Sequence, residues 1–135
     1  MAEFVRTMGL PAAKKGDHII AIDTHTVEVE GVATATPHPF DAVIDDGVCG
    51  NVYIMGAPAA TVDSTATNTP SHIPIPPDGE FVPSPSDKAT IIAGSGSVMV
   101  GGKAAARNGD TANTCNDGGD LPVGTVVAGG SVMIG

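Results

Sequence analysis

Four histidines and two cysteines are the side chains of this sequence best suited to a soft or borderline metal ion. Four of these six fall in polar segments rich in Thr, Asn, Pro and Ser, namely His25, His38, His72 and Cys115. Three imidazoles and one thiolate form a closed tetrahedral set for Zn²⁺, with no position left for water. The sequence therefore raises the hypothesis of one structural metal ion, provided that the fold brings these distant segments together.

Three segments of the chain resemble one another, which indicates an internal repeat. Each is a short apolar and β-branched run between glycines, typical of a buried strand: 50–56, 96–102 and 130–135. A second short strand, closed by a glycine turn, precedes each of them, at 42–47, 89–94 and 124–129. The pattern predicts three small β-hairpins.

Alanine pairs mark the same repeat at residues 12–13, 59–60 and 105–106. We divide the chain, as one domain, into units of about 11–56, 57–102 and 103–135, each running from an alanine pair through a polar segment to a hairpin. Small residues let backbones approach closely, so three such units suggest pseudo-threefold packing around an axis. The polar segments would then converge at one end of that axis and bring the metal-binding side chains together.

The metal hypothesis leaves two alternatives open. His18 could replace His38, since the first unit otherwise supplies two ligands, but His18 lies near an alanine pair and we interpret it as structural. The metal could be zinc or iron. Cys49 opens a predicted buried strand and is expected to be a small apolar core residue, and no disulfide to Cys115 is expected without a secretory signal.

Composition narrows the classes of function. Eighteen glycines and eleven prolines do not suit a helix-rich domain. A net charge of −9 argues against charge-driven binding to nucleic acid or anionic membranes, and one Tyr without Trp leaves little for base stacking. The sequence has no apolar run long enough for a transmembrane helix and no recognisable signal peptide.

The residues of the repeats resemble the PAAR-repeat family, whose members cap the central spike of contractile injection machines such as type VI secretion systems and phage tails. Pro11-Ala12-Ala13-Lys14 and Lys103-Ala104-Ala105-Ala106-Arg107, each leading into Gly-Asp, resemble the motif that names the family. The glycine-bounded strands 96–102 and 130–135 resemble its repeated strand turn. The second unit departs from the pattern, with Thr61-Val62-Asp63-Ser64 and a proline-rich insert from Ile73 to Lys88.

The resemblance implies an all-β cone, built from three pseudo-threefold β-hairpin repeats whose Gly/Pro/Thr-rich loops meet at a metal-bound tip. It implies one structural zinc ion held by His25, His38, His72 and Cys115. The wide base is expected to dock on a trimeric β-helical spike protein of the VgrG type. The expected function is that of a non-enzymatic piercing tip, which helps to puncture a target membrane without spanning it.

Further expectations concern cargo and location. An effector or adaptor would be held non-covalently, because we expect no fused toxin domain in this chain. The protein is expected in the bacterial cytoplasm during assembly and then outside the cell at the tip of the apparatus. The base is predicted to present apolar strand ends to the three strands of the spike, through Val52, Ile54, Val98, Val100, Val132 and Ile134.

Two other classes of function remain as alternatives. A small zinc-dependent hydrolase could combine the histidines with Asp23, Asp41 or Asp117 at an open coordination position. Against it, the sequence contains neither an HExxH motif nor a G-x-S-x-G nucleophile turn. A loop-based module that binds carbohydrate or peptide is disfavoured by the scarcity of Trp and Tyr.

Overall fold

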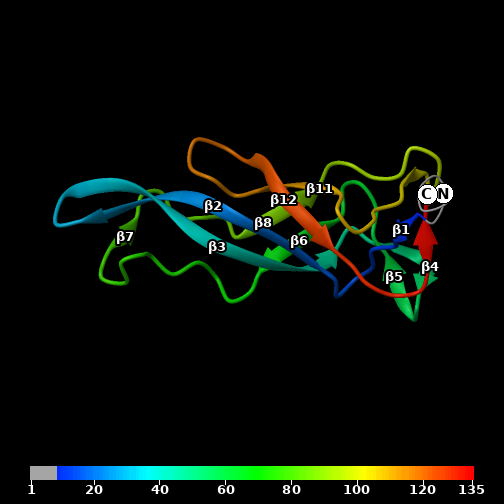
Figure 1. The fold of residues 1–135 in the computed structure, drawn as a ribbon. Helices are drawn as coiled ribbons and strands as arrows, with labels where there is room; N and C mark the ends of the chain where they lie inside the picture. The colour runs from blue at the N-terminus through cyan, green and yellow to red at the C-terminus, as the bar shows by residue number, and fades with distance from the viewer. Residues whose placement is uncertain (1–8) are drawn as a thin grey trace, which may run out of the picture.

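The computed structural model describes residues 9–135, and in this range the chain forms strands and turns without any helix. The all-β prediction is therefore confirmed, and no helix of the described residues could cross a membrane. The strands are β1 (Leu10–Pro11), β2 (His18–Val29), β3 (Val32–Asp46), β4 (Cys49–Ile54), β5 (Ala57–Ala59), β6 (Thr65–Asn68), β7 (Glu80–Phe81), β8 (Lys88–Ile91), β9 (Met99–Val100), β10 (Lys103–Ala104), β11 (Thr111–Thr114), β12 (Leu121–Val127) and β13 (Met133–Ile134) (Figure 1).

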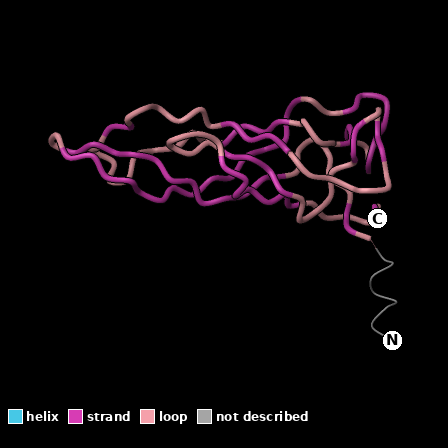
Figure 2. The backbone as a smooth tube through the Cα atoms, turned by 90° about the horizontal axis from the view of Figure 1, so that it is seen from above, coloured by secondary structure: helices cyan, strands magenta, loops and turns pink. Residues whose placement is uncertain are grey.

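Six strands close into a barrel, in the order β12-β11-β8-β6-β3-β2, with β12 pairing back to β2. Strands β2 and β3 continue beyond the barrel as one long hairpin, which ends where Val29 pairs with Val32. The two turn residues, Glu30 and Gly31, have positive φ angles of 51° and 80°, as a tight hairpin turn requires. Among the strands of residues 9–135, only β7 pairs with this hairpin near its end, so the molecule tapers to a cone (Figures 1 and 2).

Small side chains make the narrow barrel possible. The interior positions of the wall include a set of fully buried alanines, Ala42, Ala66, Ala89 and Ala112. At Gly124 even a Cβ atom would lie only 2.7 Å from a methyl group of Thr114. The strands therefore approach one another more closely than larger side chains would allow.

The alanine pairs meet at the wide end of the cone, where they form a closed ring of main-chain hydrogen bonds. The amide of Ala13 donates to Ala106 (2.9 Å), that of Ala106 to Ala60 (3.0 Å), and that of Ala60 back to Ala13 (3.0 Å). All three side chains are fully buried. The ring relates the three repeats by a pseudo-threefold axis, as the sequence predicted.

The short hairpins join other strands than predicted: the second arm of each predicted hairpin does not pair with the predicted first arm. Strand β4 pairs with β5 and β9 with β10, while β13 returns to pair with β1. The predicted first arms, at 42–47, 89–94 and 124–129, instead contribute to the barrel strands β3, β8 and β12. The polar segment of the first unit is not a loop either, because it folds as the long β2–β3 hairpin.

Most of the predicted docking residues on the base strands are buried or half-buried. The matched side chains on their inner face are only 7–8% exposed and pack against the alanines of the base: Ile54, Val100 and Ile134. Val52 and Val98 are half-buried and pack on the same cluster, whereas Val132 is exposed. Since successive side chains of a strand alternate between faces, the preceding residues point to solvent, and they are 49–61% exposed: Tyr53, Met99 and Met133.

Candidate metal centre

Three segments of the chain supply a buried cluster of metal-binding side chains in the interior of the cone. Asp23 and His25 lie two positions apart on β2 and therefore point to the same inner face. Cys115 directly follows β11, and His72 lies in the irregular segment between β6 and β7. Asp23, His25 and Cys115 are buried, and the His72 side chain is 2% exposed.

The donor atoms of this cluster converge on a common point. One donor atom each from Asp23, His25, His72 and Cys115 lies within 4.8 Å of every other. The Cys115 sulfur is 3.7 Å from Nε2 of His25. Carboxylate, imidazole and thiolate are all ligands of zinc and related ions, so these residues could hold one metal ion.

Burial and the neighbouring Asp23 carboxylate raise the pKa of the Cys115 thiol to about 11. The thiol is therefore protonated at neutral pH when no cation is near. A divalent ion binds the thiolate and displaces this proton, which couples metal binding to proton release.

Asp117 holds the imidazole of His25 in place. One carboxylate oxygen accepts a hydrogen bond from Nδ1 of His25 at 3.1 Å, and the other accepts one from the amide of Thr26. Burial opposes ionisation of Asp117, but these hydrogen bonds outweigh it, so the pKa of Asp117 lies below its usual value. With Nδ1 acting as donor, the lone pair of His25 is on Nε2, which faces the cluster.

His38 lies beside the cluster, but both of its ring nitrogens are engaged elsewhere. Its ring centroid is 5.8 Å from those of His25 and His72. Nδ1 of His38 donates to the carbonyl of Thr36 (2.8 Å), and Nε2 accepts a hydrogen bond from the amide of Ile75 (3.1 Å). Burial lowers the pKa of His38, which favours this neutral form.

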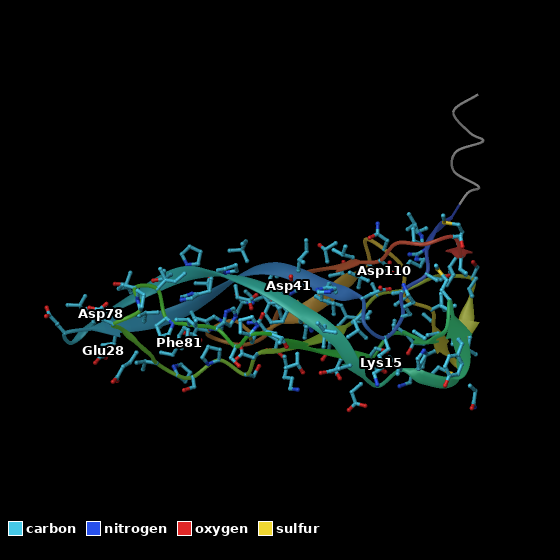
Figure 3. All side chains as sticks on the ribbon, turned by 90° about the horizontal axis from the view of Figure 1, so that it is seen from below. Lys15, Glu28, Asp41, Asp78, Phe81 and Asp110 are labelled. Atoms are coloured by element: carbon cyan, nitrogen blue, oxygen red, sulfur yellow. The ribbon has the colours of Figure 1, made fainter. Side chains whose placement is uncertain are left out.

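An aromatic ring covers the cluster on the side of the narrow end. The ring centroid of Phe81, on β7, lies 5.2–6.4 Å from the ring centroids of His25, His38 and His72. Figure 3 shows Phe81 on the barrel side of Glu28 and Asp78, which lie toward the apex. The pairing of β7 with β2, Val27 opposite Phe81, fixes this position.

The structure thus brings His25, His72 and Cys115 together and places Asp23, rather than His38, among their donor atoms. His18 lies elsewhere, on the outer face, where it pairs with Asp41 at 2.5 Å. The sequence predicts Asp23 and Asp117 only as parts of a hydrolytic site, and it gives no indication of a role for Phe81. The spacing of Asp23 and His25, two residues apart on a strand, is the signal that could have identified Asp23.

Comparison with protein families gives a match. The family model described as PAAR motif matches residues 37–113, which is more than half of the chain. No curated protein matches this sequence. The matched range includes His38 and His72 and the second and third alanine pairs.

Proposed function

Since this chain belongs to the PAAR motif family, which consists of structural spike-tip proteins of contractile injection systems, we propose that it caps a trimeric β-helical spike and acts as a piercing tip. Type VI secretion systems, contractile phage tails and related extracellular particles are the machines in which such a spike occurs.

The pseudo-threefold base is the observation that carries this proposal. A single chain can contact all three subunits of a trimer in the same way only if it offers three similar surfaces, and the ring of Ala13, Ala60 and Ala106 arranges the repeats in that way. At the matched position of each repeat, a large apolar side chain points out of the base, and these are the side chains that we propose for docking: Tyr53, Met99 and Met133. Met55 is also exposed there, at 58%.

The opposite end suits mechanical penetration better than adhesion. The apex is a two-residue turn, which concentrates force on a small area. Acidic residues surround it, with Glu28, Glu30, Asp78 and Glu80 all exposed. Because an acidic apex is repelled by anionic lipid, the driving force for entry must come from contraction of the machine.

A metal ion would tie the narrow part of the cone together. The segment that carries His72 is irregular and has no strand to hold it in place. Structural zinc sites in small peptides bind with about 10–16 kcal/mol of apparent free energy, enough to fix segments that a small core cannot hold. Four protein donors fill a tetrahedral sphere, which favours a structural ion over the open site of a zinc hydrolase.

The protein would assemble on the spike in the bacterial cytoplasm and leave the cell with it. An effector or adaptor would bind non-covalently to the outer wall. Exposed apolar side chains on adjacent strands of that wall, Ile20 and Ile22 of β2 and Val123 of β12, support such a role.

Co-expression with the trimeric spike protein of the same organism tests the docking. Native mass spectrometry is expected to detect one copy of this chain per spike trimer. The triple variant Tyr53→Asp, Met99→Asp, Met133→Asp is expected to abolish the complex, because it places charge at three apolar contacts.

Ile22→Asp is the matched control, since Ile22 is 63% exposed but lies on the outer wall. It is expected to leave the complex intact. Three copies of the chain per trimer, or a triple variant that binds as well as the control, would contradict the proposal.

A further inference from the structure

The buried carboxylate of Asp23 lies where a fourth metal ligand is needed. Its Oδ2 atom is 3.2 Å from Nε2 of His72, 3.4 Å from the Cys115 sulfur and 3.9 Å from Nε2 of His25. Metal bonds of about 2.0–2.3 Å at tetrahedral angles place ligand atoms roughly 3.3–3.8 Å apart. The observed distances are close to that range without any rearrangement of the side chains.

The surroundings of Asp23 aim a single oxygen at the cluster. The other oxygen, Oδ1, accepts a hydrogen bond from the hydroxyl of Thr114 at 2.5 Å, and the side-chain amide nitrogen of Asn116 lies 3.5 Å from it. This arrangement leaves Oδ2 free to bind as a monodentate ligand. Outer partners of this kind orient the ligands of metal sites.

Because Asp23 is buried, its carboxylate must be compensated by a nearby positive charge. Asp23 is 0% exposed, and within residues 9–135 its ion-pair partners are His25 and His72 of the same cluster. A fully buried carboxylate is costly unless a cation compensates it. A divalent ion bound by Asp23 and the Cys115 thiolate has a net charge of zero, so it compensates both buried anions.

His38 serves a different purpose in the same region. Its Nε2 atom accepts a hydrogen bond from the main-chain amide of Ile75. That bond anchors the segment that carries His72, which lies three residues before Ile75. A nitrogen that accepts this hydrogen bond cannot at the same time coordinate a metal. His38 is therefore a positioning residue for His72.

We propose that the metal ion of this protein is bound by Asp23, His25, His72 and Cys115, and that Asp23 replaces the third histidine that the family resemblance implies. This inference rests on the metal ion of the proposed function. It concerns the ligand set alone and does not depend on docking to a spike.

The test compares Asp23→Asn and His38→Gln in the full chain, with His18→Gln as the control at an exposed site. Zinc affinity is measured by competition with a chromophoric chelator, and metal content by mass spectrometry. Asp23→Asn is expected to weaken zinc binding by about 100-fold or more, since it removes a ligand rather than an outer partner. His38→Gln is expected to lose about tenfold or less, and His18→Gln nothing.

X-ray absorption of the zinc-loaded native chain keeps the test independent of how the variants fold. Scattering from the outer atoms of coordinated rings counts the imidazoles, and two are expected. Three imidazoles, loss of zinc in His38→Gln but not in Asp23→Asn, or a native chain that takes up no metal would each overturn the proposal. Spike binding is measured separately, so failure to dock with an intact two-imidazole site would contradict the proposed function alone.

Discussion

The main-chain amide of Ala13 donates a hydrogen bond to the carbonyl of Ala106 at 2.9 Å, which joins the first repeat directly to the third. Together with Ala60, these residues bring three segments of one chain to a common axis at the base. Only a side chain as small as alanine allows this approach, because all three are fully buried.

Substitution of Ala106 by leucine is expected to destabilise the fold by about 1–3 kcal/mol or more, since the added atoms have no space beside the axis. Urea unfolding measures the change. Ala35→Leu, at an exposed position of β3, provides the matched control and is expected to change stability by less than about 0.5 kcal/mol. Equal stability of the two variants would refute the close packing at the axis.

Ser64 replaces an aspartate of the repeat without loss of its role. In the first and third units, an aspartate carboxylate accepts a hydrogen bond from the main-chain amide three positions earlier. The amide of Lys14 donates to Asp17 at 3.0 Å, and the amide of Arg107 donates to Asp110 at 2.7 Å. In the second unit the hydroxyl of Ser64 accepts the amide of Thr61 at 2.9 Å and itself donates to Gly47. The second turn is thus equivalent in geometry to the others.

Ser64→Ala is therefore expected to cost about 1–3 kcal/mol of stability, because it leaves the buried amide of Thr61 without its acceptor. Thermal unfolding of the metal-free and zinc-loaded protein measures the loss in both states. Ser86→Ala, on an exposed loop, is expected to unfold like the native chain. A loss no larger than that of Ser86→Ala would show that the Ser64 contact contributes little.

The repeats were predictable because glycine and alanine spacing recurs in the sequence. The sequence could not predict which side chains of the base strands point inward, because neighbouring residues on both faces are apolar. Tyr53 and Ile54 form one such pair, and Met133 and Ile134 form another. Their orientation is decided by pairing with strands of neighbouring repeats, which are distant in sequence.

The long β2–β3 hairpin was missed for a different reason. Its inward positions carry Asp23 and His25 between the apolar residues Ile19 and Val27, so the alternation of polar and apolar side chains is interrupted. The interruption itself marks the site, since polar residues on an inner face need partners. His38 shared this signal, but only the contact with Ile75 distinguishes its role from that of a ligand.

Asp117→Asn is expected to weaken zinc binding by about 10–100-fold, because a neutral amide at this position could no longer orient His25 through a charged hydrogen bond at Nδ1. Chelator competition measures the affinity. Asp120→Asn removes the same charge from an exposed position nearby and is expected to have little effect. If Asp117→Asn and Asp120→Asn have the same zinc affinity, Asp117 acts only through the overall charge of the region and not through His25.

Phe81→Ala is expected to speed zinc loss to an excess of chelator several-fold, because the ring shields three imidazoles from water. The release rate, rather than the affinity, is the sensitive quantity. Val82→Ala shortens the next residue, which is exposed, and is expected to leave the rate unchanged. An unchanged rate in Phe81→Ala would show that the chelator gains access by another route.

The arrangement of the base on its partner is tested most directly by cryo-electron microscopy of this chain bound to the spike trimer. We expect one copy on the threefold axis, with Tyr53, Met99 and Met133 each in contact with a different spike subunit and the β2–β3 turn pointing away. Binding to the side of the spike, or contact through the narrow end, would contradict the account.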